Sequence, residues 1–231
     1  MPITLITGGN RGLGRESARR LIGLGHTVYI GSRDVRRGQR AADYLGAQLL
    51  QLDVTDDASV SRAAAELTAR EGHLDVLINN AGLFEGAIDP EDITGAEMHR
   101  IYDVNVFGIV RMTHAFLPLL RAAHCPVIVN VGSGRGSFGV VTDPGRNEST
   151  SAVPIYASSK AAVSMLTLQY AKALPDIRIN VVDPGYTATD LTGHAGHQTV
   201  TKGTDAIVSL ATIGLDGPHG TFSDRRGALP W

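Results

Sequence analysis

The sequence alternates short, almost wholly apolar runs with longer segments in which apolar residues recur at helical spacing. Six runs rich in β-branched residues predict strands, at Ile3–Thr7, Thr27–Ser32, Gln48–Asp53, Val76–Asn79, Val127–Val131 and Arg178–Val182. The longer segments predict helices, at Gly14–Leu24, Ala58–Glu71, Met98–Leu120 and Ala157–Leu174. Strands that are apolar on both faces are typical of parallel sheets, whose strands need crossover helices. The pattern therefore predicts an α/β fold, a doubly wound Rossmann-like parallel sheet with helices on both faces.

A length of 231 residues suits one domain, so we expect residues 1–231 to form a single unit with a substrate site built from its own loops. Two segments are predicted to be these loops. Residues 134–154 are rich in Gly, Ser, Thr and Pro, and residues 193–203 are bounded by glycines. Both follow predicted strands, and open α/β sheets bind ligands at the carboxyl ends of their strands.

The composition and charge of the chain argue against several classes of protein. The net charge of −2 and the scattered basic residues argue against a nucleic-acid partner. No run approaches the roughly 18 apolar residues of a membrane span, and no signal-like segment opens the chain. Cys125 is the only cysteine, which excludes an internal disulfide and a multi-thiolate metal site. We therefore expect a cytoplasmic protein with neither membrane nor metal.

A glycine cluster lies between the first predicted strand and the first predicted helix, with the spacing G-x-x-x-G-x-G. Such glycines let the backbone approach a pyrophosphate, which the free N–H groups of the helix N-terminus then bind. The spacing differs from the general G-x-G-x-x-G fingerprint, so an ordinary glycine-rich turn is the alternative. The predicted cofactor contacts in this turn are Gly8, Asn10, Arg11, Gly12, Leu13 and Gly14.

The second predicted strand ends at Ser32, and Arg33 and Asp34 follow it. At this position an acidic residue typically binds the ribose of NAD, whereas an arginine accommodates the 2′-phosphate of NADP. The guanidinium of Arg33 suits a phosphate, and Arg11 could supply a second cation. We therefore predict NADP(H). A solvated Arg33, or an Asp34 turned toward the ribose, is the alternative.

Polar or small residues also end the third and fourth predicted strands. Asp53, followed by Val54, could accept a hydrogen bond from an adenine amino group, or it could simply cap a turn. Asn80, Ala81 and Gly82 close the fourth strand, where small residues let the backbone approach the adenine ribose. These five residues are further predicted cofactor contacts.

Tyr156 and Lys160 lie four residues apart on a predicted helix and therefore share one face. A phenol has a pKa near ~10, and a neighbouring ammonium lowers it toward the range useful for acid–base catalysis. Ser133 ends the fifth predicted strand and brings a hydroxyl to the same edge of the sheet.

These motifs together resemble the short-chain dehydrogenase/reductase family, and most closely its NADPH-dependent carbonyl reductases. The elements in family order are T-G-x-x-x-G-x-G at Thr7–Gly14, N-N-A-G at Asn79–Gly82, Ser133, Y-x-x-x-K at Tyr156–Lys160 and P-G at Pro184–Gly185. The resemblance implies that Tyr156 protonates the carbonyl oxygen, Ser133 orients it, and Lys160 tunes Tyr156 and binds the nicotinamide ribose. It also implies that Asn105 holds a water in a proton relay, and that Pro184, Gly185, Thr187 and Thr189 contact the nicotinamide.

Some features depart from the family pattern. The gap between Ser133 and Tyr156 is longer than usual, as in carbonyl reductases, and Thr187 stands where the family commonly has valine. Asp190, His194 and His197 have a spacing that would bind a metal on a helix, but the neighbouring glycines argue against a helix, so a mobile polar lid is expected instead.

The sequence therefore predicts an NADP(H)-dependent reductase of a small ketone or aldehyde, and the resemblance implies a dimer or tetramer. One alternative is a 3-oxoacyl thioester reductase, for which Arg111, Arg121 and Arg135 could form a basic rim. A second is an NADP-sensing regulatory protein without turnover, which the presence of Tyr156 disfavours.

Overall fold

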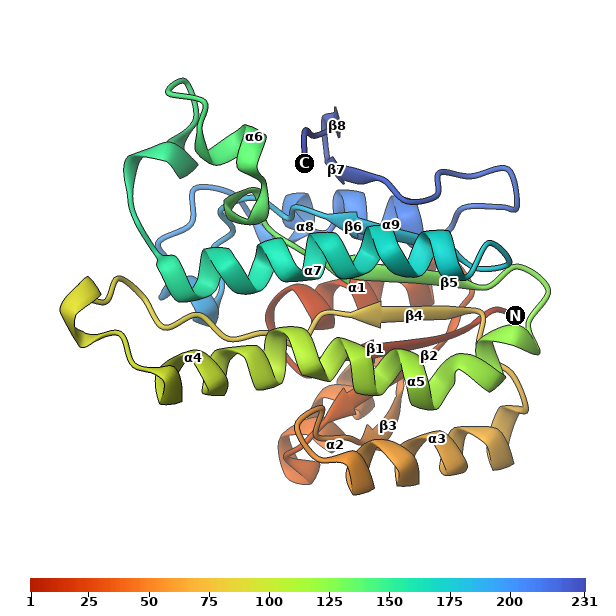
Figure 1. Cartoon of the computed structure of the whole chain (residues 1–231). Helices are drawn as coiled ribbons and strands as arrows, with labels where there is room; N and C mark the ends of the chain where they lie inside the picture. Colours follow the sequence, from red (N-terminus) through yellow and green to blue (C-terminus); the bar gives the residue numbers. More distant parts are fainter.

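Eight strands form one sheet in the order β3-β2-β1-β4-β5-β6-β7-β8 in the computed structural model, which describes all residues 1–231 (Figure 1). The strands β1 to β7 run parallel, and only β8 is antiparallel to its neighbour β7. Their bounds are β1 Ile3–Thr7, β2 Thr27–Ser32, β3 Gln48–Gln51, β4 Val76–Asn79, β5 Val127–Val131, β6 Arg178–Val182, β7 Phe222–Asp224 and β8 Gly227–Ala228. The chain winds outward from β1 in one direction and from β4 in the other, so the switch point lies between these two strands.

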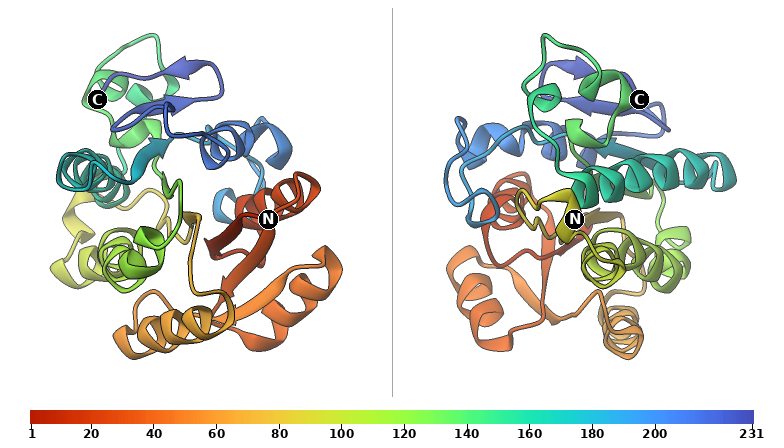
Figure 2. Two further views of the ribbon diagram at one scale, coloured as in Figure 1. Left: turned by 90° about the vertical axis from the view of Figure 1, so that its right-hand side faces the viewer. Right: turned by 60° about the vertical axis from the view of Figure 1, so that its left-hand side comes forward.

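Helices cover both faces of the sheet, which makes three layers (Figure 2). One face carries α3 (Asp57–Glu71), α5 (Gly108–Arg121) and α7 (Pro154–Ala173). The other carries α1 (Gly12–Gly23), α2 (Val35–Leu45) and α9 (Asp205–Ala211). The shorter helices α4 (Gly95–Tyr102), α6 (Phe138–Val141) and α8 (Val200–Gly203) lie in connecting segments.

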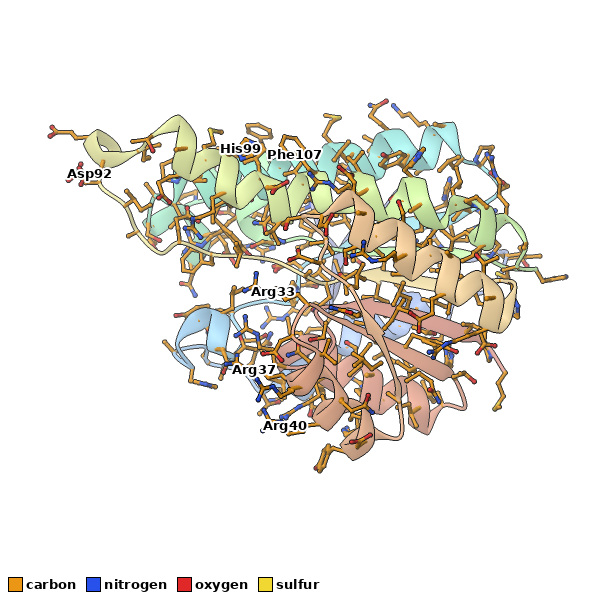
Figure 3. The ribbon with its side chains drawn as sticks, turned by 90° about the horizontal axis from the view of Figure 1, so that it is seen from below. Arg33, Arg37, Arg40, Asp92, His99 and Phe107 are labelled. Atoms are coloured by element: carbon orange, nitrogen blue, oxygen red, sulfur yellow. The ribbon has the colours of Figure 1, made fainter.

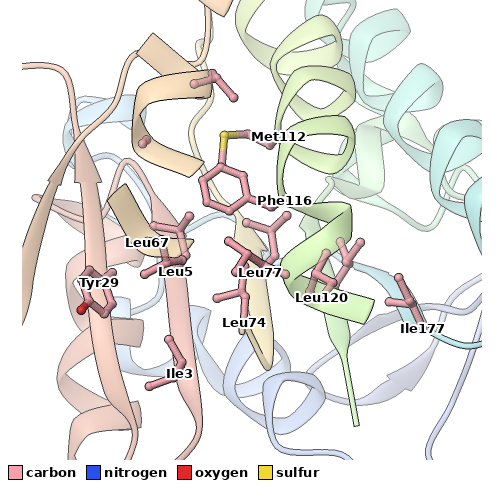
Figure 4. Close-up of a cluster of buried hydrophobic side chains, with 14 of the residues drawn as sticks. Ile3, Leu5, Tyr29, Leu67, Leu74, Leu77, Met112, Phe116, Leu120 and Ile177 are labelled. Atoms are coloured by element: carbon pink, nitrogen blue, oxygen red, sulfur yellow. The ribbon is translucent and has the colours of Figure 1, made fainter. Parts of the chain in front are cut away.

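The two faces of the sheet are buried under two separate hydrophobic clusters. Successive strand residues point to opposite faces, so Leu5 packs in the cluster under α3 and α5 while Ile6 packs in the cluster under α1 and α9. Figure 4 shows the first cluster, in which Phe116 and Met112 of α5 lie over the central strands. Both faces of the sheet are buried, which explains why the sequences of the strands are almost continuously apolar.

The predicted fold and six predicted strands are confirmed, with β3 ending two residues early. The predicted helix Met98–Leu120 is interrupted: residues Asp103–Phe107 form a π-turn between α4 and α5. The sequence prediction missed α2, because its buried residues are only the small Gly38, Ala41 and Ala42. It also missed α9, β7 and β8.

The predicted loop 134–154 contains short helical turns, and the C-terminal residues pack against it. The Ser137 hydroxyl donates to the carbonyl oxygen of Pro230 at 2.6 Å, and the Gly139 N–H donates to the carbonyl oxygen of Trp231 at 2.9 Å. The Trp231 ring lies 5.7 Å from the ring of Phe222 in β7. These contacts fix the loop to the sheet edge. None of the helices is both long and apolar enough to span a membrane.

Candidate active site

A cleft of about 710 Å³ opens at the carboxyl ends of the strands, over the switch point between β1 and β4. Most of the residues predicted from the sequence line it: Gly8, Asn10, Arg11, Gly12, Leu13, Ser32, Arg33, Asp53, Val54, Asn80, Ala81, Gly82, Tyr156, Lys160, Pro184 and Thr189. Gly14, Asn105, Ser133, Gly185 and Thr187 are not part of this lining.

The glycine turn after β1 forms the floor of the cleft. Gly8 and Gly12 have positive φ angles of 63° and 52°, which side chains rarely adopt. Helix α1 begins at Gly12, no side chain caps its N-terminus, and its first turn carries no acidic residue. Its free N–H groups and positive dipole end therefore face the cleft and suit an anion such as a pyrophosphate.

The ends of β1 and β4 are tied together by Thr7 and Asn80. The Thr7 hydroxyl oxygen accepts hydrogen bonds from the N–H groups of Asn80 and Ala81, both at 2.9 Å. The Asn80 side-chain amide donates to the carbonyl oxygens of Thr7 at 2.8 Å and Gly8 at 3.3 Å. The asparagine therefore braces the glycine turn by bonding to its backbone carbonyl groups.

A group of arginines lies at the end of β2, where Arg33, Arg37 and Arg40 line the same end of the cleft (Figure 3). Asp34 lines the same end of the cleft. Its carboxylate caps α2 by accepting the N–H of Arg37 at 3.0 Å, and it lies 3.3 Å from the Arg37 guanidinium. The alternative in which Asp34 binds a ribose therefore requires this cap to open.

Asp53 has the turn-capping role, one of the two that the sequence left open, and its contact with adenine stays a prediction. One carboxylate oxygen accepts the N–H of Thr55 at 3.0 Å and its hydroxyl at 2.8 Å, which forms the turn before α3. The residue also lines the cleft beside Val54.

Tyr156 and Lys160 project from the first turns of α7 toward the end of β5. The Lys160 ammonium lies 5.6 Å from the centre of the Tyr156 ring and is only 5% exposed as a residue. The Ser133 hydroxyl oxygen accepts the N–H of Arg135 at 3.2 Å, which leaves its proton free to donate to Tyr156 or to a ligand. The three polar groups therefore meet at one end of the cleft.

Burial dominates the protonation of this group. Burial is the largest cause that raises the pKa of Tyr156 to about 12. The Ser133 hydroxyl and Arg135 lower this pKa, whereas the Asp183 and Glu85 carboxylates raise it. Burial also lowers the pKa of Lys160 to about 8, against an opposing effect of Asp183. Without a ligand, Tyr156 is thus a protonated phenol at neutral pH and not the easily ionised group that the sequence predicted.

Asn105 lies within the π-turn between α4 and α5, and its side chain bridges two elements. Its amide oxygen accepts the N–H of Leu83 at 2.8 Å, and its amide nitrogen donates to the Leu83 carbonyl at 3.0 Å and the Ser159 hydroxyl at 3.0 Å. Every polar atom of the side chain is engaged within the protein. In this structure Asn105 therefore joins the segment after β4 to α7.

The segment after β6 contributes Pro184 and Thr189 to the cleft, while Thr187 is buried. The Gln198 side chain donates to the Thr187 hydroxyl at 2.9 Å and to the Pro184 carbonyl, which ties the predicted lid to this segment. Asp190 lies 3.4 Å from Arg11 and 3.1 Å from His194. No group of three or more His, Cys, Asp or Glu side chains is arranged to hold a metal ion.

Four residues around the cleft were missed by the sequence analysis. Arg37 and Arg40 stand four and seven positions after Arg33, a spacing that could have indicated one helical face. Asp183 directly follows β6, a position typical of ligand sites. No motif in the sequence pointed to Glu85, because only the tertiary structure brings it to Tyr156.

Comparisons with known proteins identify the family of this chain. A sequence profile described as short chain dehydrogenase matches residues 2–199. The chain is 35% identical to "Short-chain dehydrogenase anuI" of Penicillium roqueforti, covering 92% of this chain and 89% of that one. It is 30% identical to a (+)-neomenthol dehydrogenase of Capsicum annuum, covering 96% and 95%. An NADPH-bound carbonyl reductase from chicken fatty liver superposes with a TM-score of 0.87 at 26% identity over 100% of both chains. The match over most of the chain, and the similarity of the whole fold, mean that this protein belongs to the short-chain dehydrogenase family.

Proposed function

We propose that this protein is an NADP(H)-dependent carbonyl reductase acting on a neutral ketone or aldehyde. The observation that carries the proposal is the continuous cleft, which runs from Arg33 and Arg37, past the N-terminus of α1, to Tyr156 and Lys160. Its parts match, in order, a 2′-phosphate, a pyrophosphate and a reacting carbonyl.

The arginines at the end of β2 support NADP(H) over NAD(H). Arg33, Arg37 and Arg40 line the end of the cleft that would receive a phosphate, and Asp34 caps α2 and pairs with Arg37. A charge-assisted hydrogen bond contributes about 1.5–3 kcal/mol, so each contact to a 2′-phosphate favours NADPH by roughly ten- to a hundredfold.

When bound, NADPH supplies the hydride for the carbonyl carbon. Tyr156 holds the proton that the carbonyl oxygen needs, because its phenol is protonated at neutral pH. Ser133 has a hydroxyl proton free to donate to the same oxygen. Lys160 stands beside Tyr156, where its ammonium stabilises the phenolate left after proton transfer.

The surroundings of Tyr156 support a substrate without a carboxylate. Asp183 and Glu148 flank Gly134, since a Cβ there would lie 3.0 Å and 3.3 Å from their oxygens, and Glu85 accepts the N–H of Tyr156. The guanidinium of Arg135, a candidate for binding a carboxylate, donates hydrogen bonds to the carbonyl and hydroxyl oxygens of Ser151. Charged carboxylates at these positions would repel an anionic substrate, against the attraction of Lys160 and Arg135.

The apolar side chains of residues 134–154 divide between the protein interior and the solvent. Val140 and Val153 are buried in the protein interior, and Phe138 is 76% exposed, so these side chains do not form one surface. Phe84, whose ring centre lies 5.0 Å from that of Tyr156, is the nearest aromatic residue to the reacting group.

The 3-oxoacyl thioester alternative receives no support from the three arginines that suggested it. Arg111 pairs with Asp57 and Asp103, and Arg121 pairs with Asp176 on another part of the surface. No basic rim for an acidic carrier results.

The test is steady-state kinetics on a panel of neutral and carboxylate-bearing ketones and aldehydes, followed by loss of NADPH absorbance. We expect turnover of neutral compounds and a kcat/KM with NADPH at least about tenfold above that with NADH. Equal values for the two cofactors, or a preference for carboxylates, would overturn the respective part of the proposal.

A further inference from the structure

The N-terminus of the catalytic helix α7 lacks a local cap. The residue before the helix, Val153, has no side chain that accepts a hydrogen bond, and Pro154 occupies the first helical position. The first bond within the helix is donated by Ala157, to the carbonyl oxygen of Val153. The N–H of Tyr156 is therefore one of the donors that a helix leaves without an internal partner.

Glu85 supplies that partner from 71 residues away. Its carboxylate oxygen Oε1 accepts the N–H of Tyr156 at 3.0 Å. A carboxylate at this place also interacts favourably with the positive end of the helix dipole. The bond is to the backbone of the same residue whose phenol is the proposed acid.

The segment that carries Glu85 is itself attached to α7. Asn105 binds both backbone groups of Leu83 and donates to Ser159 on α7. The edge of the Phe84 ring meets the Tyr156 ring at 77°. Three successive residues therefore contact the catalytic helix: Leu83 through Asn105, Phe84 through the Tyr156 ring, and Glu85 directly. Only Glu85 binds the backbone of Tyr156.

The second carboxylate oxygen of Glu85, Oε2, is buried and has no hydrogen-bond partner. Burying an unpaired charged oxygen is costly, so a side chain with only a packing role would not be expected to carry one here. The Glu85 carboxylate is also one of the groups that raise the pKa of Tyr156.

We propose that Glu85 is a positioning residue, which anchors the backbone of Tyr156 to the segment after β4 and sets both the place and the electrostatic surroundings of the phenol. This assignment rests on the proposed function, because it acts through Tyr156 as the proton donor. It adds to that function a residue outside the motifs that define the family in this sequence.

The charge of Glu85 acts on Tyr156 together with the groups of the other elements around it. Besides burial, these are Ser133 and Arg135 after β5, which lower the pKa of Tyr156, and Asp183 after β6, which raises it together with Glu85. Lys160, on the same helix, faces the ring. Removing only the charge of Glu85 should therefore lower the pKa of Tyr156.

Two substitutions separate the anchor from the charge. Glu85→Gln keeps an oxygen that accepts the Tyr156 N–H and removes the charge, whereas Glu85→Ala removes both. Asp75 offers a matched control: its carboxylate accepts the N–H of Ile3 at 2.7 Å over 72 residues, next to the amino end of β4 and so at the opposite edge of the sheet. Asp75→Asn and Asp75→Ala should change stability without changing catalysis.

We expect Glu85→Ala to lower kcat by roughly ten- to a hundredfold, because a displacement of about 1 Å at a reacting group has an effect of this size. Glu85→Gln should retain most of kcat at its optimum. Its pH profile for alcohol oxidation, which needs the phenolate, should rise at a lower pH than that of the unmodified protein, since a charge that disfavours the phenolate is gone. The Asp75 variants should leave the profile unchanged.

Hydrogen exchange at the Tyr156 N–H gives a readout that does not depend on turnover. Protection should fall in Glu85→Ala and persist in Glu85→Gln and both Asp75 variants. This result would support the anchor even if no carbonyl compound were reduced, so failure of the proposed function is distinguishable. Unchanged Tyr156 protection in Glu85→Ala, or an unmoved pH profile in Glu85→Gln, would overturn the assignment. If Glu85→Ala does not fold, the Glu85→Gln profile still decides it.

Discussion

The buried ammonium of Lys160 donates a hydrogen bond of 2.8 Å to the carbonyl oxygen of Val131, the last residue of β5. This bond fixes the lysine against the edge of the sheet and directs it across the ring of Tyr156. A single neutral acceptor compensates only part of the cost of burying the charge. The consequence is a measurable dependence of stability on pH.

The first prediction concerns that dependence in the absence of cofactor. Burial lowers the pKa of Lys160 to about 8 in the folded protein, against about 10.4 when unfolded. Between these values the unfolded state binds one more proton, so stability rises with pH. Burial of the charged lysine should therefore lower the free energy of unfolding by up to about 3 kcal/mol below pH 8. About 2 kcal/mol of this loss should be recovered by pH 10.

The measurement is urea unfolding of the unmodified protein and of Lys160→Met at several pH values. The free-energy difference between the two should move in favour of the unmodified protein from pH 8 to 10. Tyr156 acts in the opposite direction only above pH 10, because burial raises its pKa to about 12. A difference that stays constant with pH would contradict the prediction.

The second prediction separates proton donation from cofactor binding. Tyr156→Phe keeps the aromatic ring beside Phe84 and removes the hydroxyl, so turnover should fall by about 10²–10⁴-fold. NADPH affinity, measured by fluorescence titration, should change little. Near-normal turnover in the variant would mean that another group supplies the proton.

The third prediction tests the arginines at the end of β2. Arg33→Ala and Arg37→Ala should each reduce kcat/KM with NADPH by roughly ten- to a hundredfold and leave the value with NADH almost unchanged, because only NADPH has the 2′-phosphate. Arg62→Ala is the control, since Arg62 is exposed on α3 and pairs with Asp56. Equal losses with both cofactors would indicate a structural role for the arginines.

The fourth prediction uses two glycines in the same helix. A Cβ at Gly14 would lie 2.6 Å from the Gly8 carbonyl oxygen and 2.6 Å from the Asn80 amide, whereas a Cβ at Gly23 would meet nothing within 4 Å. Gly14→Ala should thus destabilise the protein by about 1–3 kcal/mol and weaken NADPH binding. Gly23→Ala, at the end of α1, should stabilise it by up to about 1 kcal/mol. Thermal unfolding with and without NADPH measures both effects, and a neutral Gly14→Ala would refute the close approach.

The sequence alone determined the parts of this protein that depend on local pattern. Apolar runs such as Val127–Val131 fixed the buried parallel strands, because a strand covered on both faces tolerates few polar residues. The order of strands and helices then restricted the topology to a doubly wound sheet. Strand ends placed Ser133 and the glycine turn at one edge of the sheet, since the carboxyl ends of parallel strands meet there.

Elements without an apolar stripe could not be predicted from the sequence. Helix α2 buries only small residues, so its pattern resembled a polar loop, and the helices within residues 134–154 are single turns. The break between α4 and α5 was likewise invisible, because a π-turn shifts the helical register without changing the type of residue.

Only the tertiary structure decided how individual side chains are used. Asp34 turned out to cap α2, and Asn105 and Asn80 bind backbone groups of distant segments. The contact of Glu85 with Tyr156 spans 71 residues and depends on how the segment after β4 lies against α7. A hydrogen bond depends on distance and direction, which tertiary packing sets and residue type does not. The same holds for the pKa of Tyr156, because burial, which dominates it, is a property of the folded chain.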